Sequence, residues 1–276
     1  MRLPVNVIQY DNGENMKKVN VKEISRKSFW ILALLVILYG IQHFINFLSY
    51  DYRGPSGLFV KLFAGVGLEE NLSRFILWDI LQIAITFICF TLFFRKTLKE
   101  LGFNLLNLKA GMVYISRFFL VYPLIVAAIW FVIYRTAGST ALTGGVSDQP
   151  ISYMVKDILV YSLLPGFGEE PLFRVFVIQI LLTQVFRGTD LSDGSTRKWL
   201  IFISSAFFAY GHIYITSWAP FQVSLNVLQL VAAFALGIFY ANTYIRTKSI
   251  LPAVVCHNYS DFISRLGSYI LFYFIK

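Results

Sequence analysis

The chain has 276 residues, of which 57% are hydrophobic and only 14% are charged. Because an average soluble domain is about one-quarter charged, this composition excludes an ordinary soluble protein and indicates a polytopic membrane protein. The formal net charge of +9 does not indicate a nucleic-acid partner, since lysines and arginines cluster in the loops that flank apolar runs, as membrane topology signals do.

The chain begins with a polar stretch, residues 1–28, which we expect to be a cytoplasmic N-terminal segment. The first apolar run follows at residues 29–50. It is long enough to cross a bilayer and too long for the apolar part of a signal peptide, so it predicts a retained helix. We therefore divide the chain into this segment and a single transmembrane domain at 29–276.

Further apolar runs predict an all-α, polytopic fold with about eight crossings. They lie at 75–94, 112–134, 199–215 and 221–244, with an interrupted run at 152–186 and two shorter runs at 249–264 and 266–275. Basic residues concentrate in alternate loops, which predicts that both termini lie on the cytoplasmic side if the run at 152–186 crosses the membrane once. We expect this membrane to be a prokaryotic plasma membrane.

The run at 152–186 is interrupted by Pro165, Gly166 and Gly168. Proline and glycine free backbone groups that must find partners within lipid, so irregular backbone at this depth indicates a buried segment or a watery cavity. Pro171 suits the first turn of a resumed helix. We therefore expect one broken helix beside a cavity among the later helices.

Charged groups inside membrane segments cost several kcal/mol each and are more often functional than on a soluble surface. The candidate ionisable residues within the predicted spans are Asp79, Arg117, Glu169, Glu170, Arg174, His212, His257 and Asp261, with His43 as the third histidine. Glu170 and Arg174 are four residues apart and can neutralise each other on one helical face. Glu169 is left without a partner in its own segment, which suits a general base.

Two histidines lie on separate predicted spans. His212 has Phe208 one turn before it, and His257 has Asp261 one turn after it. If both histidines meet Glu169, the group supplies a carboxylate to take a proton from water, an imidazole to orient that water, and donors for a developing oxyanion. The same groups could instead bind zinc, although the helical H-E-x-x-H spacing is absent.

The stretch LEENLSR repeats the two-acid spacing at Glu69, Glu70 and Arg74. Because it lies in a short loop at the start of a span, we interpret it as a solvated helix N-terminus. Asp79, Arg117 and His43 have no local constellation, and we place them outside the site.

Three motifs in order resemble the CAAX-processing and bacteriocin-processing (CPBP, or Abi) membrane endopeptidases. They are E-E-x-x-x-R at Glu169–Arg174, F-x-x-x-H at Phe208–His212 and H-x-x-x-(N/D) at His257–Asp261, within about residues 155–262. The resemblance implies that Glu169 and His212 activate water, and that His257 and Asp261 bind the oxyanion or the substrate carbonyl. It also implies supporting roles for Glu170, Arg174 and Phe208.

Two positions depart from the family pattern. Asp261 stands where eukaryotic and archaeal prenyl endopeptidases tend to have Asn, and Val175 stands where many members have Gly. An ionised Asp cannot donate a hydrogen bond. Asp261 therefore either is protonated at the oxyanion or orients His257.

The resemblance predicts an intramembrane endopeptidase acting on a peptide, a lipoprotein or a prenylated CAAX-type substrate. Its mechanism would require no metal, with zinc as an open alternative. Its partners would be membrane lipid and a peptide or protein substrate, lipidated or plain. The rival hypothesis is a non-catalytic transport or bacteriocin-immunity protein that uses the buried charges for binding.

Overall fold

Long helices make up most of the computed structural model, which describes residues 7–8, 18–19, 21–50, 56–138, 148–189, 191–218 and 220–274. The helices before the motif region are α1 (Val21–Tyr50), α2 (Ser56–Ala64), α3 (Glu70–Phe93) and α4 (Leu108–Ala137). The motif region contains α5 (Ile151–Leu163), α6 (Pro165–Glu170), the π-helix η2 (Pro171–Phe176), α7 (Val177–Ile180), the π-helix η3 (Leu181–Val185), α8 (Gly194–Tyr210), α9 (Val227–Thr247) and α10 (Leu251–Phe274). Two short antiparallel hairpins pair β1 (Val7–Ile8) with β2 (Lys18–Val19) and β3 (Tyr214–Trp218) with β4 (Phe221–Ser224).

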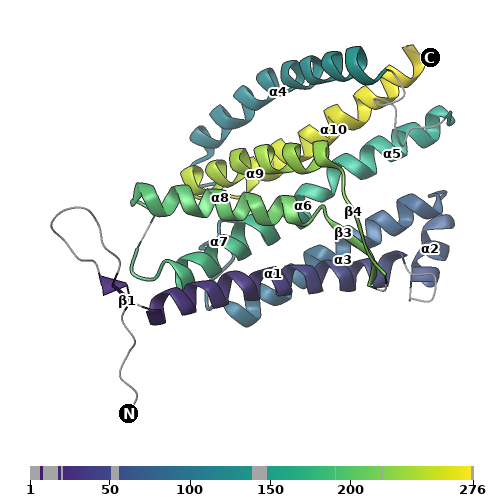
Figure 1. The fold of residues 1–276 in the computed structure, drawn as a ribbon. Helices are drawn as coiled ribbons and strands as arrows, with labels where there is room; N and C mark the ends of the chain where they lie inside the picture. The colour runs from purple at the N-terminus through teal and green to yellow at the C-terminus, as the bar shows by residue number, and fades with distance from the viewer. Residues whose placement is uncertain are drawn as a thin grey trace.

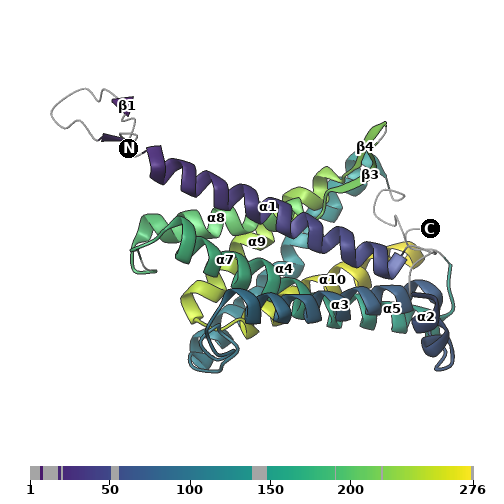
Figure 2. The same ribbon diagram turned by 90° about the horizontal axis from the view of Figure 1, so that it is seen from below.

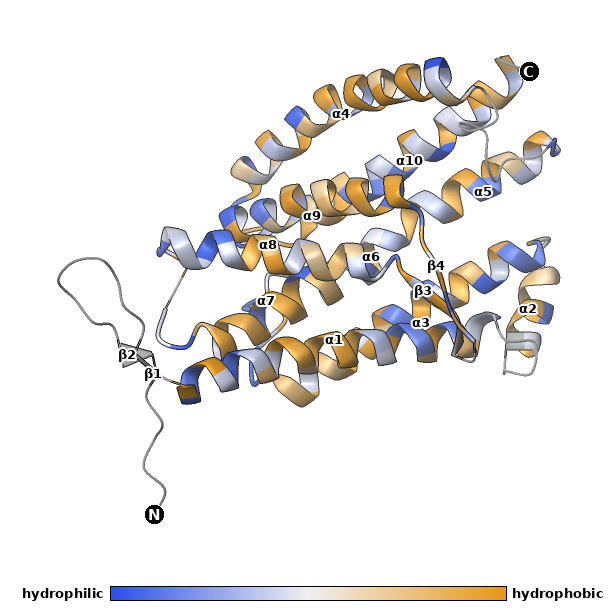
Figure 3. Cartoon of the chain, in the orientation of Figure 1, coloured by the Kyte–Doolittle hydropathy of each residue, from blue (hydrophilic) through white to orange (hydrophobic). Residues whose placement is uncertain are grey.

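Four helices in the described part of the chain are long and apolar enough to cross a membrane: α1, α3, α4 and α9. Their outward faces carry large apolar side chains, as on α4, where Leu120 and Leu124 are 73% and 68% exposed. In Figure 3 the ribbons of α1 and α4 carry mostly the colours of hydrophobic residues. Such faces are stable only against lipid or another apolar partner, so the chain is a helical membrane protein.

The predicted crossings at 249–264 and 266–275 are wrong as separate elements, because α10 covers both as a continuous helix. Arg265, which lies between the two runs, is not in a loop. It pairs with the buried carboxylate of Asp157 on α5, with Nη2 2.7 Å from Oδ1. A compensated charge need not interrupt a membrane helix. These two predicted crossings are therefore one helix, which reduces the predicted number of crossings by one.

The boundaries of three other elements also differ from the prediction. The runs at 199–215 and 221–244 each include part of the β3–β4 hairpin, which separates α8 from α9. The first helix starts at Val21 rather than residue 29, and its extra turns carry an ion pair between Lys27 and Glu23 (2.7 Å). The rest of the predicted segment 1–28 lies outside the described residues apart from β1 and β2.

The helices run back and forth between two ends of the bundle (Figures 1 and 2). We call one the basic end, which holds the start of α1 and the α3–α4, η3–α8 and α9–α10 connections. The other, the hairpin end, holds α2, the β3–β4 hairpin and the last turns of α10 (Figure 1). The start of α1 and the end of α10 thus lie at opposite ends, which does not fit the prediction that both termini share one side of the membrane.

The predicted break at residues 165–168 is a closely packed helical segment. Leu164 keeps right-handed helical angles (φ −95°, ψ −41°), and α6 follows directly. A Cβ on Gly166 would lie 2.4 Å from Oδ1 of Asn258, and one on Gly168 would lie 2.8 Å from Oε1 of Gln82. These glycines therefore let α6 pack closely against α10 and α3.

The helix changes its winding at Pro171, the first residue of η2. Proline has no N–H to donate to the carbonyl one turn earlier, and its ring crowds that carbonyl. A π-turn is a usual way to absorb such a defect, often at functional sites. Every residue of η2 is buried, so the irregular backbone lies inside the protein, as membrane depth requires.

Candidate active site

Asn258, a residue of α10, forms two hydrogen bonds to the backbone where α5 meets α6. Its Oδ1 accepts from the backbone N–H of Gly166 (2.9 Å), and its Nδ2 donates to the carbonyl of Leu163 (2.9 Å). Because His257 precedes Asn258, these two hydrogen bonds hold the imidazole of His257 beside Glu169 and Glu170 at the end of α6.

Glu170 is the hub of a buried polar network. Its carboxylate accepts from Nε (3.0 Å) and Nη2 (3.2 Å) of Arg174, and both side chains are 0% exposed. The second partner of Glu170 is His257, whose Nδ1 lies 2.8 Å from Oε1. A carboxylate paired with arginine only accepts hydrogen bonds, so this ring nitrogen carries the hydrogen. Glu170 thus fixes the orientation of His257 as well as neutralising Arg174.

The other ring nitrogen of His257 faces two further acids. Its Nε2 lies 3.8 Å from Oε2 of Glu169 and 3.4 Å from Oδ2 of Asp261. Tyr240 stacks on the ring at 5.1 Å between centroids, and its hydroxyl is 2.8 Å from Oγ of Ser260. The imidazole is therefore locked in place, with Nε2 aimed at the acids.

His212 lies in the turn after α8, where its Nδ1 is 2.9 Å from the carbonyl of Phe208. Since a carbonyl only accepts, Nδ1 carries the hydrogen, and Nε2 of a neutral ring keeps a lone pair. Phe208 contacts both imidazoles edge-on, at 5.1 Å from His212 and 5.7 Å from His257, and the guanidinium of Arg174 lies 4.3 Å above its ring. Phe208 is the apolar spacer of the site.

A polar cavity of about 390 Å³ is lined by Glu169, His212, His257 and Asp261 together with side chains from α1, α3, α5 and α9. We call it the polar pocket. The structure thus brings together the four residues that the sequence selected, while Glu170, Arg174 and Phe208 lie directly behind them. Glu169 stays accessible, with 15% of its side chain exposed, against 0% for Glu170.

The second two-acid stretch is separate from this pocket. Arg74 donates to Oε1 of Glu70 through Nε (2.9 Å) and Nη2 (2.7 Å), and the Glu70 side chain is 62% exposed. Glu69 is 3.3 Å from Nζ of Lys156 at the helix start. The interpretation as an exposed helix N-terminus is confirmed.

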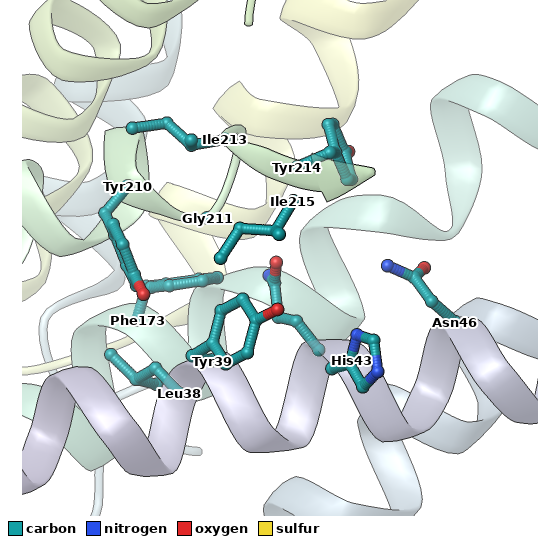
Figure 4. Close-up of a pocket in the computed structure, with 11 residues that line it drawn as sticks. Leu38, Tyr39, His43, Asn46, Phe173, Tyr210, Gly211, Ile213, Tyr214 and Ile215 are labelled. Carbon is teal, nitrogen blue, oxygen red and sulfur yellow. The ribbon is translucent and has the colours of Figure 1, made fainter. Parts of the chain in front are cut away.

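His43 faces a smaller cavity of about 40 Å³ between α1 and residues 210–215. Figure 4 shows Tyr39, His43 and Asn46 along one side of α1, facing the segment that carries Tyr210 and Tyr214. The polar pocket and this cavity share Tyr214, but His43 lines only the small one. His43 therefore lies outside the candidate site, as predicted.

Arg117 lines an apolar groove of about 820 Å³ between α4, α9 and α10. This groove shares Gln229, Ser264 and Ser268 with the polar pocket, so the two spaces adjoin.

Asp79 was excluded on sequence but lies beside the pocket. It is 0% exposed, neither carboxyl oxygen has a hydrogen-bond partner among the described residues, and it interacts electrostatically with Glu169 and Asp261. The signal was present, because an acid in the middle of an apolar span is costly. However, Asp79 belongs to no sequence motif that would link it to Glu169 or Asp261.

In the described part of the chain, His, Cys, Asp and Glu side chains do not gather in threes with the geometry of a metal site. Catalytic zinc sites in proteins usually supply three such ligands. The nitrogens of His257 are instead directed at carboxylates. The donor arrangement therefore does not fit zinc as it stands.

Residues 151–263 match the family model described as Rce1-like, type II CAAX prenyl endopeptidase. The match contains all three motifs and confirms the resemblance to the CPBP endopeptidases over this segment. The family is one of membrane proteases. Searches of curated proteins and of solved structures gave no match to the chain.

Proposed function

From this match to membrane endopeptidases, we propose that the chain hydrolyses peptide bonds within the membrane, using Glu169, His212, His257 and Asp261. The observation that carries the proposal is the polar pocket itself. Residues from α6, the turn after α8, and α10 line one cavity that is large enough to admit water and a peptide segment.

Glu169 is the general base of the proposed reaction. It takes a proton from water while the water oxygen attacks the carbonyl carbon of the scissile bond, and Nε2 of His212 accepts the second water hydrogen to orient the attack. The tetrahedral intermediate collapses as the C–N bond breaks, and Glu169 returns the proton to the leaving nitrogen. Its partial exposure, next to buried Glu170, suits contact with water.

His257 stabilises the oxyanion in this scheme. Glu170 holds its Nδ1 hydrogen, so a protonated ring presents Nε2–H to the pocket. Asp261, 3.4 Å from that nitrogen, is placed to hold the imidazolium rather than to donate to the oxyanion. We therefore favour the orienting role for Asp261.

The substrate is proposed to be a peptide with an apolar portion. The groove that adjoins the pocket is lined mainly by apolar side chains of α4 and α9. An apolar side chain or an attached lipid would be buried there, while the scissile bond reaches Glu169.

The experiment is cleavage of a hydrophobic peptide library by the purified protein in lipid vesicles. Glu169→Ala, His212→Ala and His257→Ala should each abolish cleavage, while Glu69→Ala, the matched change in the exposed stretch, should not. Full cleavage by all three site variants would refute the proposed site. Retention of cellular function by Glu169→Gln would favour the non-catalytic binding protein instead.

A further inference from the structure

An excess of positive charge gathers at one end of the bundle. The basic residues there are Lys22, Arg26, Lys27, Arg95, Lys96, Lys99, Lys109, Arg187, Arg197, Lys198, Arg246 and Lys248. The acids described at the same end are Glu23, Glu100 and Asp193. Short loops rich in lysine and arginine stay on the cytoplasmic side of a membrane, so this asymmetry places the basic end in the cytoplasm.

The hairpin end has a different charge balance. Arg74, Lys156 and Arg265 each pair with an acid, respectively Glu70, Glu69 and Asp157. Paired charges give little net attraction to the cytoplasmic surface of a membrane. Lys61 on α2 and Arg135 in the last turn of α4 also lie at the hairpin end, but they are far fewer than the basic residues of the basic end. The orientation signal of the described loops therefore comes mainly from the basic end.

The polar pocket extends from the acids toward the hairpin end. Along α10 its lining runs from His257 to Ser268, a rise of roughly 16 Å toward the C-terminal end of that helix. Its other outer residues are Tyr50, the last residue of α1, and Gln229, in the first turn of α9. Figure 1 shows the end of α1 at the hairpin end and the start of α9 at the point where the β3–β4 hairpin joins it.

Toward the basic end the site is closed by packed side chains. Phe173, Arg174 and Phe176 of η2 are at most 1% exposed, and Ala253 and Cys256 of α10 are 0% exposed. A peptide cannot pass through such a core without unfolding it. The open direction of the pocket is therefore the hairpin end.

We propose that the pocket opens on the non-cytoplasmic side, so that the substrate is a peptide segment reached from outside the cell or from the outer leaflet. The claim about the substrate rests on the proposed function. The orientation of the pocket in the membrane rests only on the charge distribution and the packing. Exported peptides and membrane-anchored lipoproteins meet the requirement. A cytosolic C-terminus does not.

Cysteine labelling tests the orientation without requiring activity. The native thiols, Cys89 and Cys256, are buried and are replaced by Ala. Ser268→Cys then reports on the pocket mouth and Lys198→Cys, at an exposed position on α8, reports on the basic end. A membrane-impermeant maleimide applied to intact cells should label the cysteine at 268, while labelling at 198 should be lost until the cells are permeabilised. The reverse pattern, or equal labelling of both, would overturn the proposal.

Membrane vesicles of known orientation test the substrate side. A cleavable peptide added outside right-side-out vesicles should be hydrolysed, and the same peptide added outside inverted vesicles should not. Cleavage only in inverted vesicles would overturn the inference. If neither preparation cleaves, the proposed function fails, and the labelling result still decides the direction of the pocket.

Discussion

Glu169 and Glu170 are adjacent in sequence, yet their replacement by glutamine should have opposite consequences. Glu170→Gln removes the charge that compensates Arg174, and both side chains are 0% exposed. Breaking a buried pair in this way costs about 3–5 kcal/mol, because the remaining charge stays desolvated. For a chain of this size that energy corresponds to a fall of roughly 10 °C in the unfolding temperature.

Glu169→Gln leaves the buried pair intact. Its side chain is partly exposed, and its neighbour His257 keeps the bond to Glu170. We expect its unfolding temperature to stay near that of the wild type while cleavage is lost. The adjacent variants therefore separate a structural acid from a reactive one.

Thermal unfolding of the purified variants in detergent, followed by tryptophan fluorescence, measures this contrast. The double variant Glu170→Leu with Arg174→Leu should recover part of the loss, since it leaves no uncompensated charge. The reasoning would be refuted if Glu170→Gln unfolded within about 2 °C of the wild type, the shift expected of a change worth less than 1 kcal/mol. It would be refuted equally if Glu169→Gln kept full activity.

Three further changes test other parts of the structure. Asp79→Asn should raise the unfolding temperature, because it removes a buried acid whose oxygens have no described partner; an unchanged or lower value in the same assay would contradict this. Gly166→Ala should cost about 1–3 kcal/mol and reduce kcat, since its Cβ meets Asn258 at 2.4 Å, whereas Gly40→Ala on the open face of α1 should do neither. Treatment with a chelator should leave peptide cleavage intact, and a loss of activity that zinc restores would replace the proposed mechanism with a metal-dependent one.

The sequence was sufficient for the helical membrane fold and for choosing the residues that meet in the polar pocket. Apolar runs and buried charges carry most of that information, because lipid penalises unsatisfied polar groups so strongly. The presence of Glu169, His212 and His257 in this order on separate spans then distinguished the Glu169–Glu170 stretch from the similar stretch at Glu69 and Glu70.

Features that depend on contacts between residues far apart in the chain could not be predicted from the sequence. Arg265 separates two apolar runs that were predicted as two crossings, and its partner Asp157, which lies on another helix, explains why α10 continues through it. Gly166 and Gly168 suggested a break, although their role is close packing against residues of other helices. Asp79 had no motif, and its neighbours became visible only when α3 and α6 were placed together.

The π-helical turn at Pro171–Phe176 also constrains how this segment can change in length. A π-turn holds about one residue more than an α-turn for the same rotation, so removing one residue from it would let the turn close to an ordinary α-helix with the helix beyond it nearly unrotated. Removing one residue from the α-helical turn that follows, Val177–Ile180, would instead rotate everything beyond it by about 100° relative to α6. The first deletion would change the four-residue spacing of the buried pair Glu170–Arg174, and the second would make η3 present a different face to α1. Substitutions cannot repair a change of phase, so we expect this stretch to tolerate replacements far better than insertions or deletions. The spacing of the motif is in this sense a property of the backbone winding as much as of its side chains.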